Sequence, residues 1–235
     1  MTFSIPPRTA ILGIIAGAMG LPKESYHEDM NSENIRIGIS VTSKIKKSFH
    51  RLNYLMIKSN SDFRGKRKTP IQTPFEIVSG IDPKRDEVRY KIFVSSTEKG
   101  KEVFEKIRSV FLSEKFIYNP TMGTANFSAR ITHIELYTKN EVSMLKVNNE
   151  LLTLDSACLS ENVGKIFFDK ADEYRYNMIE EELMPADFKK NGDREIVKMN
   201  SVLFTTGNMQ LQVYFTGVLY VISRGTLHQT IQFLD

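Results

Sequence analysis

Phe3-Ser-Ile-Pro-Pro-Arg-Thr-Ala-Ile-Leu-Gly-Ile-Ile-Ala-Gly-Ala-Met-Gly-Leu-Pro22 is the stretch around which the rest of the chain is organised. Pro6 and Pro7 favour the start of a helix, because a proline in the first turn loses no needed donor and has its φ already set. The run Gly20-Leu21-Pro22 predicts its end. Gly13 and Gly17 lie four residues apart and share one face, where we expect another backbone to approach closely. Apolar residues cover most of the remaining surface, so we expect burial on nearly all sides.

The N-terminus of this helix is its polar end. Arg8, Thr9 and the free backbone N–H groups of the first turn are expected to face outward. Because the N-terminus of a helix attracts negative charge, this end is a candidate binding site for an anion such as a phosphate.

The segments that follow predict an α+β fold. Apolar and polar residues alternate over 35–41, which indicates a half-buried strand, and an amphipathic helix is predicted over 97–113. Further strands are predicted at 52–57, 71–78, 87–95 and 129–138. With one more strand in front, the two helices and the strands at 35–41, 87–95 and 129–138 give the order βαββαβ. This is the ferredoxin-like unit, which RNA-recognition motifs share.

Residues 36–68 carry a local excess of positive charge. Ten basic residues stand there against one acid, a local net charge of +9 in a chain of net charge +4. Phe49, Tyr54 and Phe63 are interleaved with them, which is typical of a surface that binds a polyanion and stacks on bases. A merely solvated basic face is the alternative. The basic residues are Arg36, Lys44, Lys46, Lys47, Arg51, Lys58, Arg64, Lys66, Arg67 and Lys68.

The strands at 52–57 and 71–78 flank a polar tip, 59–68, so a protruding β-hairpin is predicted over about 44–78. A second polar segment, Asn119-Pro-Thr-Met-Gly-Thr-Ala-Asn126, is a glycine-bearing loop that can follow an RNA backbone. An ordinary turn is the alternative. Its candidate RNA contacts are Thr121, Met122, Gly123, Thr124 and Asn126.

Two segments resemble a known family. The first, Ser4-Ile-Pro-Pro-Arg-Thr-Ala-Ile-Leu-Gly-Ile-Ile-Ala-Gly-Ala-Met-Gly-Leu21, resembles the helix-one signature of the CRISPR-associated RAMP proteins of the Cas-five family. The second, Tyr118-Asn-Pro-Thr-Met-Gly-Thr-Ala-Asn-Phe-Ser-Ala129, is similar to a later Pro-x-x-Gly segment of that family. The layout is most similar to the subtype I-B branch. The family has a strand and a basic loop before this helix, whereas the sequence here opens almost on the helix.

The resemblance implies a ferredoxin-like (RRM/RAMP) domain at 1–140, with the basic hairpin as a thumb, and a β-rich region at 141–235 packed on it. It implies a non-catalytic subunit of a type I Cascade surveillance complex that caps the 5′ handle of the crRNA. Its partners would be the backbone subunit, the large subunit and, through the complex, target DNA. Arg8 and Thr9, the basic hairpin and the loop 121–126 would line the handle.

The region after residue 140 is rich in predicted strands. They are placed at 144–154, 163–169, 196–204, 211–222 and 230–234. Between them, 173–190 is acidic and aromatic, and we interpret it as a solvated surface rather than as a docking patch for a basic partner. One cysteine, Cys158, excludes an internal disulfide, suits a reducing cytoplasm and is interpreted as a buried small hydrophobe.

The sequence favours no catalytic, metal or cofactor site. The apolar run 10–21 is shorter than the roughly 20 residues that span a bilayer, so no membrane is expected. His50, Tyr54 and Lys47 have the residue types of a metal-independent ribonuclease, but their spacing brings them together only in a helix. An endoribonuclease that processes pre-crRNA is therefore the alternative function. A structural adaptor with little RNA contact is a second alternative.

Overall fold

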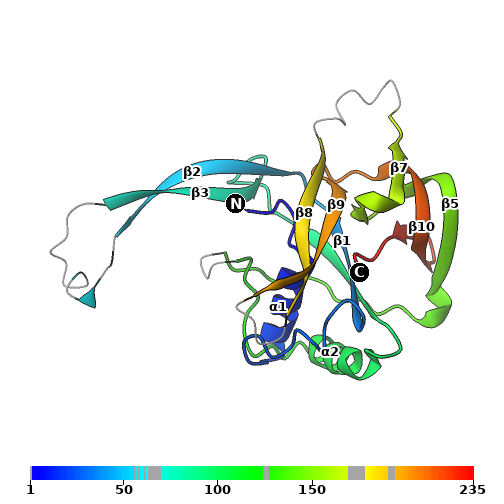
Figure 1. The fold of residues 1–235 in the computed structure, drawn as a ribbon, viewed down its shortest axis with the longest axis horizontal. Coiled ribbons are helices and arrows are strands. Elements are labelled where there is room, and N and C mark those ends of the chain that lie inside the picture. Colours follow the sequence, from blue (N-terminus) through cyan, green and yellow to red (C-terminus); the bar gives the residue numbers. More distant parts are fainter. Residues whose placement is uncertain are drawn as a thin grey trace.

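The structure is a computed structural model, and it describes residues 2–55, 57, 59–60, 62, 70–123, 127–168, 178–189 and 194–235. The described residues form a mixed α+β fold with two α-helices and eleven strands, so strands predominate (Figure 1). The N-terminal elements are α1 (Arg8–Ala18), β1 (Ile35–Val41), β2 (Ile45–Leu55), β3 (Pro70–Gly80), β4 (Tyr90–Ser96) and α2 (Lys101–Ser113). The later strands are β5 (Val142–Leu154), β6 (Cys158–Leu159), β7 (Val163–Ile166), β8 (Ile179–Phe188), β9 (Ile196–Thr205), β10 (Leu211–Arg224) and β11 (Leu227–Ile231).

Helix α1 begins and ends where the sequence predicts. Its first N–H groups, those of Ala10 and Ile11, donate to the carbonyl of Pro7. Gly20, with φ +72°, ends it, and the N–H of Leu21 donates back to the carbonyl of Ala16. A glycine in the left-handed conformation, followed by a residue whose N–H donates to a carbonyl of the last turn, is a common way for a helix to satisfy its last carbonyls.

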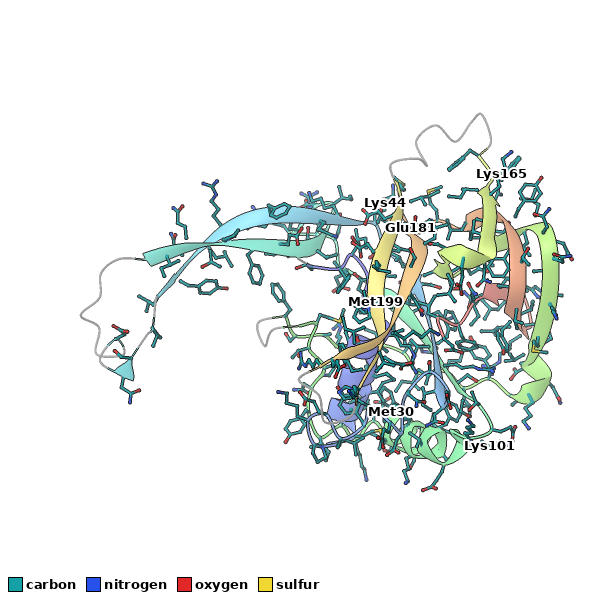
Figure 2. The ribbon with its side chains drawn as sticks, in the orientation of Figure 1. Met30, Lys44, Lys101, Lys165, Glu181 and Met199 are labelled. Carbon is teal, nitrogen blue, oxygen red and sulfur yellow. The ribbon has the colours of Figure 1, made fainter. Side chains whose placement is uncertain are left out.

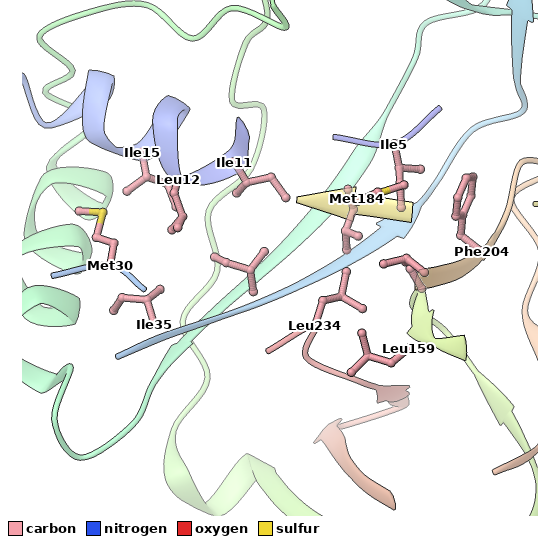
Figure 3. Close-up of a cluster of buried hydrophobic side chains, with 14 of the residues drawn as sticks. Ile5, Ile11, Leu12, Ile15, Met30, Ile35, Leu159, Met184, Phe204 and Leu234 are labelled. Atoms are coloured by element: carbon pink, nitrogen blue, oxygen red, sulfur yellow. The ribbon is translucent and has the colours of Figure 1, made fainter. Parts of the chain in front are cut away.

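The glycine face of α1 does not pack against another backbone, so that prediction is wrong. A Cβ added at Gly17 would meet no atom within 4 Å, and one at Gly13 would meet only the hydroxyl of Tyr26. The face borders an open hollow of about 510 Å³, whose rim includes Tyr118. The opposite side of the helix, with Ile11, Leu12 and Ile15, is buried in the main core (Figure 3).

Strands β1 and β4 pair antiparallel over seven residues each, and β1 has the bounds that the sequence predicts. On the edge of β1 away from β4, the carbonyls of Ile37 and Ile39 accept from the N–H groups of Leu234 and Ala157. Segments from the C-terminal half therefore lie along the edge of β1 that faces away from β4.

No strand forms at 129–138, so this part of the predicted βαββαβ order is wrong. The half-buried residues there are Ala129, Ile131, Ile134 and Tyr137, and the last three recur at a spacing of three. A half-buried strand needs a period of two, so this spacing cannot keep one face on a core. The elements α1, β1, β4 and α2 remain from the predicted unit.

Strands β2 and β3 form a two-stranded hairpin that projects from the rest of the protein (Figure 1). They pair from Ile45 with Gly80 to Leu55 with Pro70, which makes the ladder longer than the strands predicted at 52–57 and 71–78. Most of the predicted polar tip, including Arg64, lies outside the described residues.

The C-terminal half contains one three-stranded sheet, β6-β9-β8, and one sheet in which β10 pairs with β5, β7 and β11. Strand β8 occupies part of the region that was interpreted as a solvated acidic surface. The main core draws Ile5 and Ile35 from the N-terminal part and Met184, Phe204 and Leu234 from the C-terminal part (Figure 3). The two parts on either side of residue 140 therefore share one core.

Candidate nucleic-acid interface

The basic residues of β2 alternate between the two faces of the hairpin. Opposite pairs share a face, so Phe49 and Arg51 lie with Glu76 and Pro74, whereas His50 lies with Phe75 on the other side. Phe49 is 76% exposed and Arg51 is also exposed. One face of the hairpin thus presents an aromatic ring next to a guanidinium, the pair of groups that contacts bases and phosphates in single-strand binders.

The lysines at the foot of the hairpin are not equivalent. Lys44 and Lys46 are exposed, and Lys44 lies where the hairpin leaves the body (Figure 2). The Nζ of Lys46 donates to the carbonyl of Ile81 at 2.6 Å. A carbonyl carries no net charge, so this bond does not neutralise the charge of Lys46. Lys47 instead donates to the carboxylate of Glu182 in β8. Its charge is already neutralised, so Lys47 is a weak candidate for a phosphate contact.

Of the other residues in the basic block, the structure describes Arg36 but not the four at the predicted tip. The four basic residues of the predicted tip all lie outside the described residues, and they are Arg64, Lys66, Arg67 and Lys68. Arg36, counted in the same basic block, lies in β1, where it is half-buried and paired with Asp235 at 3.3 Å. The net charge of the block therefore overstates the charge that is free on its surface.

The glycine loop is closed at its base by backbone hydrogen bonds. The N–H of Met122 donates to the carbonyl of Phe127 at 2.8 Å, and Thr121 forms a bridge with Ser128. Gly123 is exposed with φ +92°, a conformation that side-chain-bearing residues rarely adopt. Thr121 and Met122 are half-buried, while Thr124 and Asn126 lie outside the described residues.

The glycine loop lies against the hairpin. The rings of Phe75 in β3 and Phe127 are stacked, with centroids 5.9 Å apart and an interplanar angle of 16°. The structure therefore places the glycine loop against the face of the hairpin that carries His50 and Phe75, opposite the face that carries Phe49 and Arg51. Sequence reasoning did not single out Phe75; its spacing of two from Ile77 could have placed both on one face, but not against residue 127.

Arg8 faces inward, so the prediction that it faces outward is wrong. Its side chain is buried, with 3% of the residue exposed. The guanidinium donates to the carboxylate of Asp187 at 2.7 Å, and to the carbonyls of Ala186, Met30 and Ile35 at 2.5 to 3.0 Å. Burial lowers the pKa of the Arg8 guanidinium, and the neighbouring Asp187 acts in the opposite direction.

The first turn of α1 is covered by β8 as well. Thr9 is buried, and its hydroxyl lies 3.5 Å from the carbonyl of Pro185 in β8. Just before the helix, the N–H and hydroxyl of Ser4 donate to the carboxylates of Glu182 and Glu180. The chain thus places its own acids and carbonyls beside this end of the helix. An RNA phosphate would meet negative charge there rather than an open site.

The three candidate catalytic residues are not assembled. His50 and Tyr54 share one face of β2, but four residues of strand separate them by roughly 13 Å. Lys47 lies on the other face and is bonded to Glu182. No cluster of His, Cys, Asp or Glu able to hold a metal ion occurs within the described part of the chain. In the same part, no helix is long and apolar enough to cross a membrane.

The face of the β1–β4 sheet that would carry bases in an RNA-recognition motif is covered here. Phe93 in β4, a residue at the centre of that face, is buried. It packs with Ile222 and Ile231 of the C-terminal strands. Exposed aromatic rings are instead found on the hairpin, as at Phe49. The site that the described residues support is therefore the hairpin together with the glycine loop, a basic and aromatic surface of the kind found in nucleic-acid-binding proteins.

The comparisons with known proteins do not extend this picture. No protein-family model matches the chain, and no curated protein matches it.

Proposed function

We propose that this protein is a non-catalytic RNA-binding subunit of a type I CRISPR surveillance complex, similar to subtype I-B, and that it holds the 5′ handle of the guide RNA. The observation that carries the proposal is the projecting hairpin, which exposes Phe49 and Arg51 on one face and Lys46 at its foot. Its other face contacts the glycine loop through the stack of Phe75 and Phe127. Lysine and arginine neutralise phosphates, and an exposed ring stacks on an unpaired base.

The order α1, β1, β4, α2 supports a RAMP-type core, in which the β2–β3 hairpin takes the part of the thumb. In this proposal, the backbone subunit and the large subunit of the complex contact the protein, and target DNA reaches it only through the complex. The segments along β1 and the covered sheet face direct the RNA to the hairpin rather than to the sheet.

The test of the handle assignment is to purify the tagged full-length protein from its complex and to sequence the RNA that comes with it. A short RNA with a uniform 5′ sequence is expected. Co-purified RNA with random 5′ ends, or none, would contradict the handle assignment.

A cleavage assay separates a binding subunit from an endoribonuclease. Repeat RNA is incubated with the protein in the absence of metal, beside a copy with a 2′-deoxy substitution at the candidate cleavage positions. No cleavage of either RNA is expected, since His50, Tyr54 and Lys47 are apart. Cleavage that depends on the 2′-hydroxyl would overturn the non-catalytic assignment and favour pre-crRNA processing.

The contribution of the hairpin can be measured through salt. Replacement of the tip residues Arg64, Lys66, Arg67 and Lys68 by alanine should lower the slope of log K against log salt by roughly 0.7 for each phosphate that is no longer neutralised. The matched control removes four positive charges from exposed residues in and just before α2 that pair with acids, and these are Lys99, Lys101, Lys106 and Arg108. An unchanged slope in the tip variant would place RNA elsewhere.

A further inference from the structure

Three exposed charged residues meet where the hairpin joins the body, and only one of them is an acid. The Nε of Arg89 lies 3.3 Å from one carboxylate oxygen of Glu87, and Nη2 of Arg130 lies 3.6 Å from the other. The side chains of Arg89, Arg130 and Glu87 are 67%, 77% and 59% exposed. The cluster carries a net positive charge, although both arginines lie outside the basic block at 36–68.

The cluster joins the foot of the hairpin to the foot of the glycine loop. The N–H of Arg89 donates to the hydroxyl of Ser43, and its carbonyl accepts from the N–H of Thr42, two residues that lie directly before β2. Arg130 follows Ala129, whose N–H donates to the carbonyl of Pro120 and closes the loop. Together with the Phe75–Phe127 stack, this gives two points at which the hairpin and the loop are tied together.

The ion pairs within the cluster are weak enough to be exchanged. Among the described residues, each guanidinium is paired with the Glu87 carboxylate over more than 3.2 Å, and all three side chains are largely in water, where such pairs contribute little stability. Arg224 shows the contrast, because it binds both Glu141 and Glu135 and donates to the carbonyl of Leu136. An RNA phosphodiester offers two charged oxygens, as the shared carboxylate does, and a guanidinium can bind it through two N–H groups.

We propose that Arg89 and Arg130 form a phosphate clamp for RNA at the foot of the hairpin, beside the glycine loop, and that Glu87 holds the clamp until a phosphate displaces it. This inference rests on the proposed RNA-binding function. Glu87 brings two like charges close together in the free protein, which would otherwise repel each other. A phosphodiester then takes the place of the carboxylate and binds both guanidinium groups.

The test compares binding of a fluorescein-labelled oligouridine to the full chain over a range of salt concentrations. The variant Arg89→Gln with Arg130→Gln should lower the slope of log K against log salt by about 0.7, because the one phosphate of the single strand that both guanidinium groups bind is no longer neutralised. The matched control is Arg108→Gln with Lys106→Gln on α2, which removes the same charge from exposed residues that are also paired with acids. The control should leave the slope nearly unchanged.

A variant of Glu87 provides a second test, in which RNA binding is expected to become tighter. Glu87→Gln should tighten binding about threefold, the factor that a unit charge roughly 7 Å from a phosphate gives in water. The gain should disappear in the Arg89→Gln, Arg130→Gln background, whereas Glu105→Gln, the control acid on α2, should give no gain. If the parent binds RNA and the arginine pair leaves the slope unchanged, the clamp is refuted while the proposed function stands. If the parent does not bind RNA, both are refuted.

Discussion

Replacing Arg8 by methionine should destabilise the protein without weakening the binding of RNA by the molecules that remain folded. The guanidinium satisfies four acceptors, of which Asp187 is a charged side chain that is 12% exposed. Removing one partner of a buried ion pair typically costs about 3 to 5 kcal/mol. Asp187 keeps its bonds from the N–H and hydroxyl of Ser32, so we expect the lower end, about 3 kcal/mol.

Urea unfolding measures this loss directly, and for a chain of this size it corresponds to a fall in the melting temperature of about 10 °C. Arg51→Met is the reciprocal control, because Arg51 is exposed on the hairpin. That variant should melt like the parent and lower the salt slope of RNA binding by about 0.7. If Arg8→Met melts like the parent and loses salt dependence instead, Arg8 is a phosphate ligand and its buried position is wrong.

Three further results are expected. Gly17→Ala should leave the stability of the protein unchanged or raise it by up to about 1 kcal/mol, since the added Cβ meets no atom within 4 Å. A clear fall in the melting temperature would refute the open face. Cys158 is fully buried and burial raises its pKa to about 12, so a thiol reagent at pH 8 should modify it only after unfolding, and rapid labelling of the native protein would contradict this. Gly123→Val with Asn126→Ala should abolish preference for the cognate handle over a scrambled one in a competition at fixed salt, while non-specific binding remains; discrimination that survives in the folded variant would assign the loop to a simple turn.

Local periodicity was sufficient to predict the strands whose two faces differ. Strand β1 has the predicted bounds because Ile35, Ile37 and Ile39 alternate with residues of the other face. Helix α2 begins at Lys101, four residues after its predicted start at Thr97, because Gly100 lies against the carbonyl of Asn34 and a side chain at that position would clash with it. That contact joins two segments far apart in the sequence, so no local signal could have shown it.

The failures occurred where charged residues find partners far along the chain. The run Glu180-Glu181-Glu182 was interpreted as a solvated surface, yet it lies in β8 and its carboxylates accept from Ser4, Lys47 and Ser201. Arg8 was predicted to face outward because a helix N-terminus is usually its polar end, but its partner Asp187 is 179 residues away in the sequence. Residue spacing carries no information on such pairs, which form only when β8 packs on α1.

The hairpin is the element whose stability depends most on what it binds. It pairs with no third strand among the described residues, and a two-stranded ribbon is marginally stable in water. Its foot is held by Ile45 in the main core and by the Lys47–Glu182 pair. Arg51 and the basic residues that follow it in sequence carry like charges, and like charges repel one another. An RNA that neutralises these charges would stabilise the ribbon in proportion to its affinity. Under the proposed function, RNA binding therefore also adds to the stability of the hairpin.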